Sequence, residues 1–255
     1  MINFNELNNK KIIVTGSSSG IGFGTAIQLL NLNAKVVFHG NKSIDNLENK
    51  IKQRTKSNNY NIIKSDFSNS ELAEQFIKDS IEYLGGLDIL INNAGTMVGR
   101  FTIDKIKDDQ FNHIFDLNAK SAYYCIKYSL NEFRKNKRGC IVNVSTISAK
   151  SGGSEGSSVY SASKSFVSSI TRSLVSELSH YNIRINAISP GTIDTLFHQR
   201  YSSKEKLEKT KNIIPMKRLG NPEDCVGPII FLCMESLSGY ITGQVLEVNG
   251  GQFFL

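Results

Sequence analysis

The sequence has no long apolar run and no pattern that marks a targeting segment. No stretch reaches the roughly 18 apolar residues that a membrane-spanning helix needs, and the most apolar one, residues 226–234, already contains Gly227 and Pro228. The first residues lack a basic region followed by an apolar one, which is the mark of a secretory signal. We therefore expect a cytoplasmic protein with no membrane partner.

Cysteine is scarce, and its spacing excludes the common structural uses of the thiol. The four cysteines are Cys125, Cys140, Cys225 and Cys233. None forms a C-x-x-C pair or belongs to a Cys/His ligand pattern. The sequence thus predicts free thiols in a reducing compartment, with neither a disulfide framework nor a metal site.

Basic residues exceed acidic ones, but they do not gather into a long stripe. The chain holds 30 Lys and Arg against 23 Asp and Glu, a net charge of +7, and most of these residues are scattered. We interpret them as a solvated surface and expect no nucleic-acid partner. One cluster, residues 134–138, follows an expected helix, where cations complement the C-terminal dipole. Docking of an acidic acyl-carrier protein is the alternative for this cluster.

Short β-branched runs alternate with longer stretches of helical period along all 255 residues, which is typical of βαβ units and a parallel sheet. Strands are expected at residues 11–15, 35–39, 61–65, 87–92, 139–145, 184–189 and 245–248. Helices are expected at residues 21–31, 43–55, 70–84, 108–136, 159–181 and 222–236. No linker or internal repeat divides the chain. The sequence predicts a single α/β domain over residues 1–255, a doubly wound Rossmann fold with a seven-stranded, mainly parallel sheet and helices on both faces.

Three expected loops, residues 96–101, 150–158 and 196–217, shape any pocket at the ends of the strands. Residues 196–217 are the least regular part of the chain and are rich in Lys, Ser and Glu. We interpret them as a mobile substrate flap, with an ordinary surface insertion as the alternative. His113, His180 and His198 have no chemical context in the sequence and are assigned to surface or packing.

The first expected strand runs into a glycine-rich turn, residues 15–22, and a helix follows at once. Glycines let the backbone approach a phosphate, and the unpaired N–H groups and dipole of a helix N-terminus supply partial positive charge. The spacing is G-x-x-x-G-x-G, and the Gly-Lys-Ser/Thr ending of a triphosphate loop is missing. We predict that the residues contacting a dinucleotide here are Gly16, Ser18, Ser19, Gly20, Ile21 and Gly22.

The second expected strand ends without an acidic residue. In NAD sites an Asp or Glu at this place holds the ribose 2′-hydroxyl and would repel a 2′-phosphate. Lys42, and less strongly Asn41, Ser43 and His39, offer donors for a phosphate. We therefore predict NADP(H) as the preferred cofactor and keep NAD(H) as the alternative. Asp66, at the end of the third expected strand, is a candidate acceptor for the adenine amino group, or else an ordinary turn residue.

Tyr160 and Lys164 lie four residues apart in an expected helix, so their side chains share one face. A phenol with a pKa of about 10 is a poor base at neutral pH, but a nearby cation stabilises the phenolate and lowers that pKa. Such a pair alone is a common accident. Its meaning depends on the motifs that accompany it.

Taken together, the motifs resemble the classical short-chain dehydrogenase/reductase (SDR) family over essentially the whole chain. The matching segments stand in the family's order at residues 15–22, 66, 92–95, 118, 141–146, 160–164, 190–192, 241–244 and 249–251. Residues 214–224 look most like the 3-oxoacyl-[acyl-carrier-protein] reductase and sugar or polyol dehydrogenase types, although that segment does not choose a substrate. The resemblance implies an enzyme that interconverts a carbonyl and a secondary alcohol of a small molecule, assembled as a homotetramer. A non-catalytic nucleotide-binding or scaffold protein of the same fold is the alternative.

The resemblance also implies roles for individual residues. Tyr160 would exchange a proton with the carbonyl oxygen as general acid and base, and a bound nicotinamide cofactor would exchange the hydride. Lys164 would hold the nicotinamide ribose and lower the pKa of the tyrosine, while Asn118 would anchor a water that links Lys164 to solvent. Further cofactor contacts are expected from Phe67, Asn93, Ala94, Gly95, Tyr160, Lys164, Pro190, Gly191 and Ile193.

One position departs from the family's pattern. Thr146 stands where a serine usually polarises the substrate, and it precedes Tyr160 by 14 residues, one more than expected. A threonine hydroxyl can donate the same hydrogen bond, although its methyl group narrows the choice of rotamer. We expect Thr146 to hold the substrate oxygen. Ser148 is the next candidate, and Ser145 is expected to point away at strand period.

Overall fold

The computed structural model describes residues 2–3, 5–41 and 44–254. Its strands are β1 (Lys11–Val14), β2 (Lys35–Gly40), β3 (Tyr60–Lys64), β4 (Ile89–Asn92), β5 (Gly139–Val144), β6 (Ile183–Pro190) and β7 (Val245–Val248). Its helices are α1 (Gly20–Asn31), α2 (Leu47–Lys52), α3 (Ser70–Leu84), α4 (Asp108–Phe115), the π-helix η1 (Asp116–Lys120), α5 (Ser121–Asn136), α6 (Ser148–Ser151), α7 (Ser158–Ser173), α8 (Val175–Ser179), α9 (Leu196–Tyr201), α10 (Lys204–Ile213), α11 (Pro222–Cys233) and α12 (Glu235–Ser238). No helix within the described ranges is both long and apolar enough to cross a bilayer.

The seven strands form one sheet in the order β3-β2-β1-β4-β5-β6-β7, and every neighbouring pair is parallel. The predicted doubly wound sheet is confirmed, with the difference that it is wholly rather than mainly parallel. The strand order reverses between β1 and β4, so the connections leave these two strands toward opposite sides. In open α/β sheets, the crevice beyond the carboxyl ends of such strands is the usual place for a ligand.

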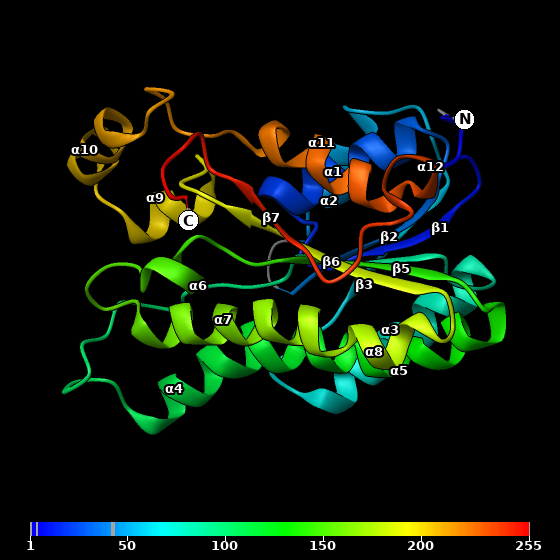
Figure 1. Ribbon diagram of the computed structural model, residues 1–255, viewed down its shortest axis with the longest axis horizontal. Coiled ribbons are helices and arrows are strands. Elements are labelled where there is room, and N and C mark those ends of the chain that lie inside the picture. The colour runs from blue at the N-terminus through cyan, green and yellow to red at the C-terminus, as the bar shows by residue number, and fades with distance from the viewer. Residues whose placement is uncertain (1, 4, 42–43, 255) are drawn as a thin grey trace.

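Helices cover both faces of the sheet, and successive strand residues feed two separate cores. Figure 1 shows α1, α2, α11 and α12 above the sheet and α3, α4, α5, α7 and α8 below it. Ile12 and Val14 of β1 belong to the core under α1 and α11, whereas Ile13 packs toward α3 and α5. Because alternate side chains of a strand point to opposite faces, a central strand buried on both sides reads as a continuous apolar run.

Several expected helices are shorter or interrupted. The predicted helix 108–136 contains the π-turn η1, because Asn118 Nδ2 donates to the Ile114 carbonyl at 2.7 Å and competes with the helical ladder. The predicted helix 222–236 breaks at Met234, whose backbone is extended, and helix 159–181 divides into α7 and α8 at Leu174. The expected helix 43–55 is confined to α2, and Ser43 lies outside the described residues.

Residues 196–217 are more regular than expected, because they fold into the two short helices α9 and α10. Both lie at one end of the molecule beyond the carboxyl ends of the strands (Figure 1). Ser203 begins α10 by accepting a hydrogen bond from the Lys206 N–H at 3.2 Å. This segment therefore covers the sheet edge at which a ligand is expected.

The basic cluster at residues 134–138 is tied to the protein's own surface. The Arg134 guanidinium stacks 4.9 Å from the ring centre of Tyr181, and Arg138 pairs with Glu235 at 2.6 Å. Arg134 and Lys135 lie in the last turn of α5. These contacts favour the interpretation in which the cluster complements the helix dipole and packs locally.

Candidate active site

A cavity of about 810 Å³ opens at the carboxyl ends of β1, β4 and β5, where the strand order reverses. Its walls come from the glycine-rich turn, the loops after β3, β4 and β5, helix α7, and α9 with α10. A cavity of this size holds a ligand of several hundred daltons. The two ends of the cavity differ in chemistry.

The glycine-rich turn packs so closely on the end of β4 that side chains are excluded. Gly16 has φ +62°, and a Cβ there would lie 2.7 Å from Ala94 Cα. A Cβ on Gly22 would lie 2.3 Å from Asn93 Nδ2, which donates to the carbonyls of Thr15 and Gly16 at 3.0 and 2.9 Å. Only glycine therefore fits at positions 16 and 22 of this turn.

The first turn of α1 suits a phosphate group. Ser19, its N-cap, makes no side-chain hydrogen bond to the helix, and the first turn contains no acidic residue. Its N–H groups and the positive end of the helix dipole therefore face the cavity without a protein carboxylate to neutralise them. These residues fit the diphosphate of a nicotinamide dinucleotide.

His39 supports the turn and is not a phosphate donor, contrary to the expectation from sequence. Its Nδ1 accepts the Gly16 N–H at 2.9 Å, so the proton is on Nε2, which donates to the Ser65 carbonyl at 3.1 Å. The ring stacks on Phe67 at 4.0 Å. Burial lowers the pKa of His39 to about 4, so the imidazole is neutral and both ring nitrogens are in use at neutral pH.

The end of β2 carries no carboxylate among the described residues 40 and 41. Asn41 lines the cavity, and Lys42 with Ser43 lies outside the described residues. Asp66 faces the same end of the cavity. Partial burial raises the pKa of Asp66, but hydrogen bonds from Ser68 and from Asn41 outweigh it and hold the pKa below its usual value. Asp66 is therefore ionised and available as an acceptor.

Lys164 is buried beside Tyr160 at the other end of the cavity. The two residues lie one turn apart on α7, and Lys164 Nζ donates to the Val144 carbonyl at 2.8 Å. Burial lowers the pKa of Lys164 to about 8. Burial also raises the pKa of Tyr160, so the phenol is protonated at neutral pH and the expected lowering by Lys164 is not seen in the protein alone.

Asn118 connects this end to the loop after β4. Its Oδ1 accepts the Thr96 N–H at 3.0 Å, and its Nδ2 donates to the Thr96 carbonyl at 2.7 Å. A Cβ on Gly95 would lie 2.6 Å from Asn118 Oδ1 and 2.9 Å from Lys164 Nζ. Gly95 therefore lets the amide and the amine approach the same stretch of backbone.

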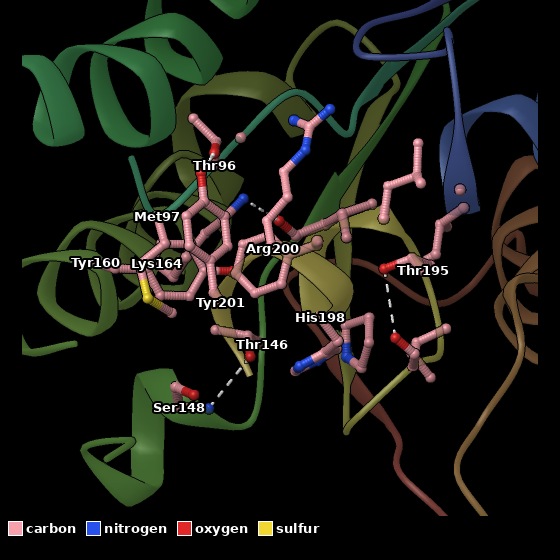
Figure 2. A pocket seen from close by; sticks show the side chains of 18 of the residues that line it. Thr96, Met97, Thr146, Ser148, Tyr160, Lys164, Thr195, His198, Arg200 and Tyr201 are labelled. Atoms are coloured by element: carbon pink, nitrogen blue, oxygen red, sulfur yellow. Dashed lines mark hydrogen bonds between the residues drawn. The ribbon is translucent and has the colours of Figure 1, made fainter. Parts of the chain in front are cut away.

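The structure separates the three hydroxyl candidates near Tyr160. Ser145 is buried and shares hydrogen bonds with the Lys164 carbonyl and Ser168 Oγ, at 3.1 and 2.7 Å, so its side chain belongs to the packing of α7. Thr146 Oγ1 accepts the Ser148 N–H at 3.3 Å and keeps its own hydrogen for another partner (Figure 2). All three residues line the cavity, so it is the hydrogen bonding of Ser145 that sets it apart from Thr146 and Ser148.

Most residues predicted for the site meet in this one cavity. The lining includes Gly16, Ser18, Ser19, Gly20, Ile21, Asn41, Asp66, Phe67, Asn93, Ala94, Gly95, Thr146, Tyr160, Lys164, Pro190, Gly191 and Ile193. Gly22 and Asn118 lie directly behind this lining, in contact with Asn93 and Gly95. Lys42 lies outside the described residues.

One family model and several known proteins match this chain over most of its length. Residues 16–252 match the family model described as Enoyl-(Acyl carrier protein) reductase. The chain belongs to the short-chain dehydrogenase/reductase family. It is 34% identical over 248 residues to dehydrogenase/reductase SDR family member 4 of Homo sapiens, covering 96% of this chain and 88% of that protein. It is 30% identical over 240 residues to the 3-oxoacyl-[acyl-carrier-protein] reductase of a Synechocystis strain, covering 94% and 95% of the two chains.

A solved structure shares the whole SDR fold. The NADH-dependent reductase A1-R′, complexed with NAD, superimposes with a TM-score of 0.86 at 30% identity, over 99% of this chain and 100% of that one. Membership of the family makes this SDR protein an NAD(P)-dependent oxidoreductase that interconverts carbonyl and alcohol groups.

Helix α9 supplies pocket residues of this SDR that sequence reasoning did not identify. The Phe197 ring lies 5.5 Å from the Tyr160 ring, and the Tyr201 hydroxyl hydrogen-bonds Thr96 Oγ1 at 2.9 Å. His198, assigned to surface or packing from the sequence, lines the cavity instead, as His113 does. No spacing signal could have found these residues, because only the fold brings them to Tyr160.

Proposed function

We propose that this SDR enzyme is an NADP(H)-dependent oxidoreductase with Tyr160 as general acid and base. The observation that carries the proposal is the placement of Tyr160 beside a buried Lys164 and an available Thr146 hydroxyl, at one end of a cavity whose other end fits a diphosphate. The site thus offers a proton donor and a second hydrogen-bond donor for one substrate oxygen.

Each side chain has a definite task in carbonyl reduction. A bound nicotinamide supplies the hydride. Tyr160, protonated at neutral pH because burial raises its pKa, gives its proton to the oxygen on which alkoxide charge develops. The Thr146 hydroxyl holds the same oxygen. Lys164 orients the ribose beside it, and Asn118 acts as a positioning residue because it fixes the loop against which Lys164 packs.

The Thr146 hydroxyl is expected to account for about two orders of magnitude in kcat, since removing one preorganised donor to an oxyanion costs on the order of 10²-fold. Thr146→Val, which keeps the shape of the side chain, should lose this factor. Thr146→Ser should retain most of the activity. If Ser148→Ala and not Thr146→Val caused the loss in steady-state assays, Ser148 would be the substrate-binding hydroxyl.

Preference for NADP(H) is proposed because the end of β2 carries an amide at Asn41 and no carboxylate among its described residues. Asn41→Asp is expected to lower kcat/KM for NADPH by about tenfold or more, because a carboxylate repels the 2′-phosphate, and to change kcat/KM for NADH much less. Asn41→Ser serves as the matched neutral variant. Equal losses with both cofactors, or faster turnover of NADH by the wild type, would refute the preference.

Catalytic turnover distinguishes the proposed enzyme from a non-catalytic scaffold protein of the same fold. Purified protein is mixed with NADPH and a panel of ketones and aldehydes, and oxidation of NADPH is followed by its absorbance. We expect oxidation that depends on the carbonyl compound. Tight binding of NADPH without oxidation by any member of the panel would favour the non-catalytic alternative.

We also propose a homotetramer in which α5 and α7 pack between subunits. Its support is an aromatic surface on α4 and α5, where Phe111 and Tyr123 are 45% and 43% exposed. Exposed aromatic side chains are enriched where proteins associate. A role for residues 134–138 in docking an acyl-carrier protein has less support, because Arg134 and Arg138 already have partners within the chain.

A further inference from the structure

The substrate end of the cavity is lined by cations without carboxylates. Arg100, Arg200 and Lys206 line it, and none of them takes part in an ion pair between described residues. The one acidic residue that the described lining contains is Asp66, at the cofactor end after β3. The positive charge beside Tyr160 is therefore not neutralised by the described lining.

Two of these cations converge on one hydroxyl group. Arg100 Nη1 and Lys206 Nζ each donate to Ser154 Oγ at 3.0 Å. Like charges so close together repel, and an anion between them would relieve that repulsion. The position of Arg100 is fixed, because its Nε donates to the Tyr201 carbonyl at 2.7 Å and its Nη1 also donates to the Glu155 carbonyl at 3.0 Å.

Arg200 lies one helical turn from Phe197, whose ring packs against Tyr160. On α9 it follows Phe197 by three residues and precedes Tyr201 directly, and both neighbours face the site, Phe197 against Tyr160 and Tyr201 against Thr96. Residues three apart share a face of a helix. Figure 2 shows Arg200 among the side chains that line this pocket, together with His198. Arg200 makes no hydrogen bond to any described residue through its side chain, so its guanidinium is available to a ligand.

The acidic residues of the neighbouring helix are occupied elsewhere. On α10, Glu205 pairs with Lys209 at 2.7 Å and Glu208 with Lys211 at 3.8 Å, which leaves Lys206 as the basic residue of this helix that lines the cavity. Burial and the charge of Arg100 lower the pKa of Lys206, and they outweigh the carboxylate of Glu155, which raises it. Glu155 does not line the cavity. Burial and the charges of Arg100 and Lys206 likewise lower the pKa of His198, and they outweigh Asp194, which raises it. Asp194 does not line the cavity either.

We infer that the substrate is a carbonyl compound that carries an oxyanion, a carboxylate or a phosphate monoester, a few bonds from the reacting carbon. Arg200 and Lys206 bind the oxyanion, and Arg100 adds its charge while holding the loops around it. Guanidinium and ammonium groups form their strongest hydrogen bonds with such oxyanions. The inference rests on the proposed function, because it places the anion relative to Tyr160.

The test compares matched pairs of substrates that differ in charge. Acetoacetate is compared with its methyl ester, and dihydroxyacetone phosphate with dihydroxyacetone, each with saturating NADPH. We expect kcat/KM at least about tenfold higher for the anion of one pair, and the pair that responds tells carboxylate from phosphate. Arg200→Gln and Lys206→Gln should each remove most of that preference and leave the neutral member within about twofold. Lys209→Gln, on the outer side of α10, should change neither value.

The outcomes separate the two proposals. If neutral members are reduced as well as the anions, or if Arg200→Gln and Lys206→Gln affect both members equally, the inference fails while the proposed function stands. Reduction of other carbonyls in the panel but of neither anion would also overturn the inference. Failure of every carbonyl compound to oxidise NADPH would instead overturn the proposed function.

Discussion

Tyr160→Phe should lower kcat for carbonyl reduction by about 10²- to 10⁴-fold, the range expected when a general acid is removed. In the proposed mechanism the phenol gives its proton to the developing alkoxide, and phenylalanine keeps the ring that packs 5.5 Å from Phe197. The Tyr160 hydroxyl makes no hydrogen bond to described residues, so its removal leaves no buried partner unsatisfied. We therefore expect unchanged thermal stability and a dissociation constant for NADPH within about twofold of wild type.

The control for this variant is Tyr240→Phe, which removes a phenol hydroxyl from a fully exposed residue just after α12. Its kcat should equal that of the wild type. Steady-state kinetics and a fluorescence titration with NADPH separate loss of chemistry from loss of binding. A Tyr160→Phe enzyme that keeps kcat within tenfold of wild type on the same substrate would refute general acid catalysis by this residue.

The sheet could be predicted well from the sequence because its central strands are buried on both faces. Each strand then appears as a short, mostly apolar run whose length and flanking turns favour a strand over a helix, and β5, buried along its whole length, is an example. The points at which helices are interrupted could be predicted less well. The π-turn at η1 depends on the Asn118 side chain reaching the Ile114 carbonyl, and no local propensity encodes that contact.

The glycine-rich turn carries a local signal of its own, whereas Tyr160 with Lys164 could be singled out only through the motifs that accompany the pair along the chain. His39 shows the limit of this reasoning. A histidine at a strand end suggests a donor to a phosphate, yet its two ring nitrogens bind the Gly16 N–H and the Ser65 carbonyl, 23 and 26 residues away in the sequence. Its role follows from tertiary contacts alone.

The three segments that line the substrate end were expected from the sequence, but the contacts between them could not be predicted, because they lie far apart along the chain. Arg100 joins the loop after β4 to the Tyr201 carbonyl and to Ser154, which are 101 and 54 residues away. The charges of these segments look like ordinary surface residues in the sequence. Their chemical role follows only from their convergence on one cavity, whose described lining holds a single carboxylate, Asp66, at the cofactor end.

Lys164→Met should reduce kcat by on the order of 10³-fold, since in the proposed mechanism this amine orients the cofactor ribose beside Tyr160. The same variant should change how stability depends on pH. Burial lowers the pKa of Lys164 from 10.5 to about 8 in the folded, cofactor-free protein. Between these two values the unfolded chain binds a proton that the folded chain does not.

The sign of this effect follows from proton linkage. The free energy of unfolding should rise with pH from about 8 to about 10.5, by on the order of 3 kcal/mol from this residue, whereas below pH 8 the residue adds no pH dependence, because it is charged in both states and its burial cost is constant. In Lys164→Met that rise should be absent, whereas the exposed Lys105→Met control should keep it. Urea unfolding of the three proteins at pH 7, 8, 9 and 10 measures the difference. Parallel pH curves for wild type and Lys164→Met would mean that the amine keeps its charge when buried, held by the Val144 carbonyl it meets at 2.8 Å.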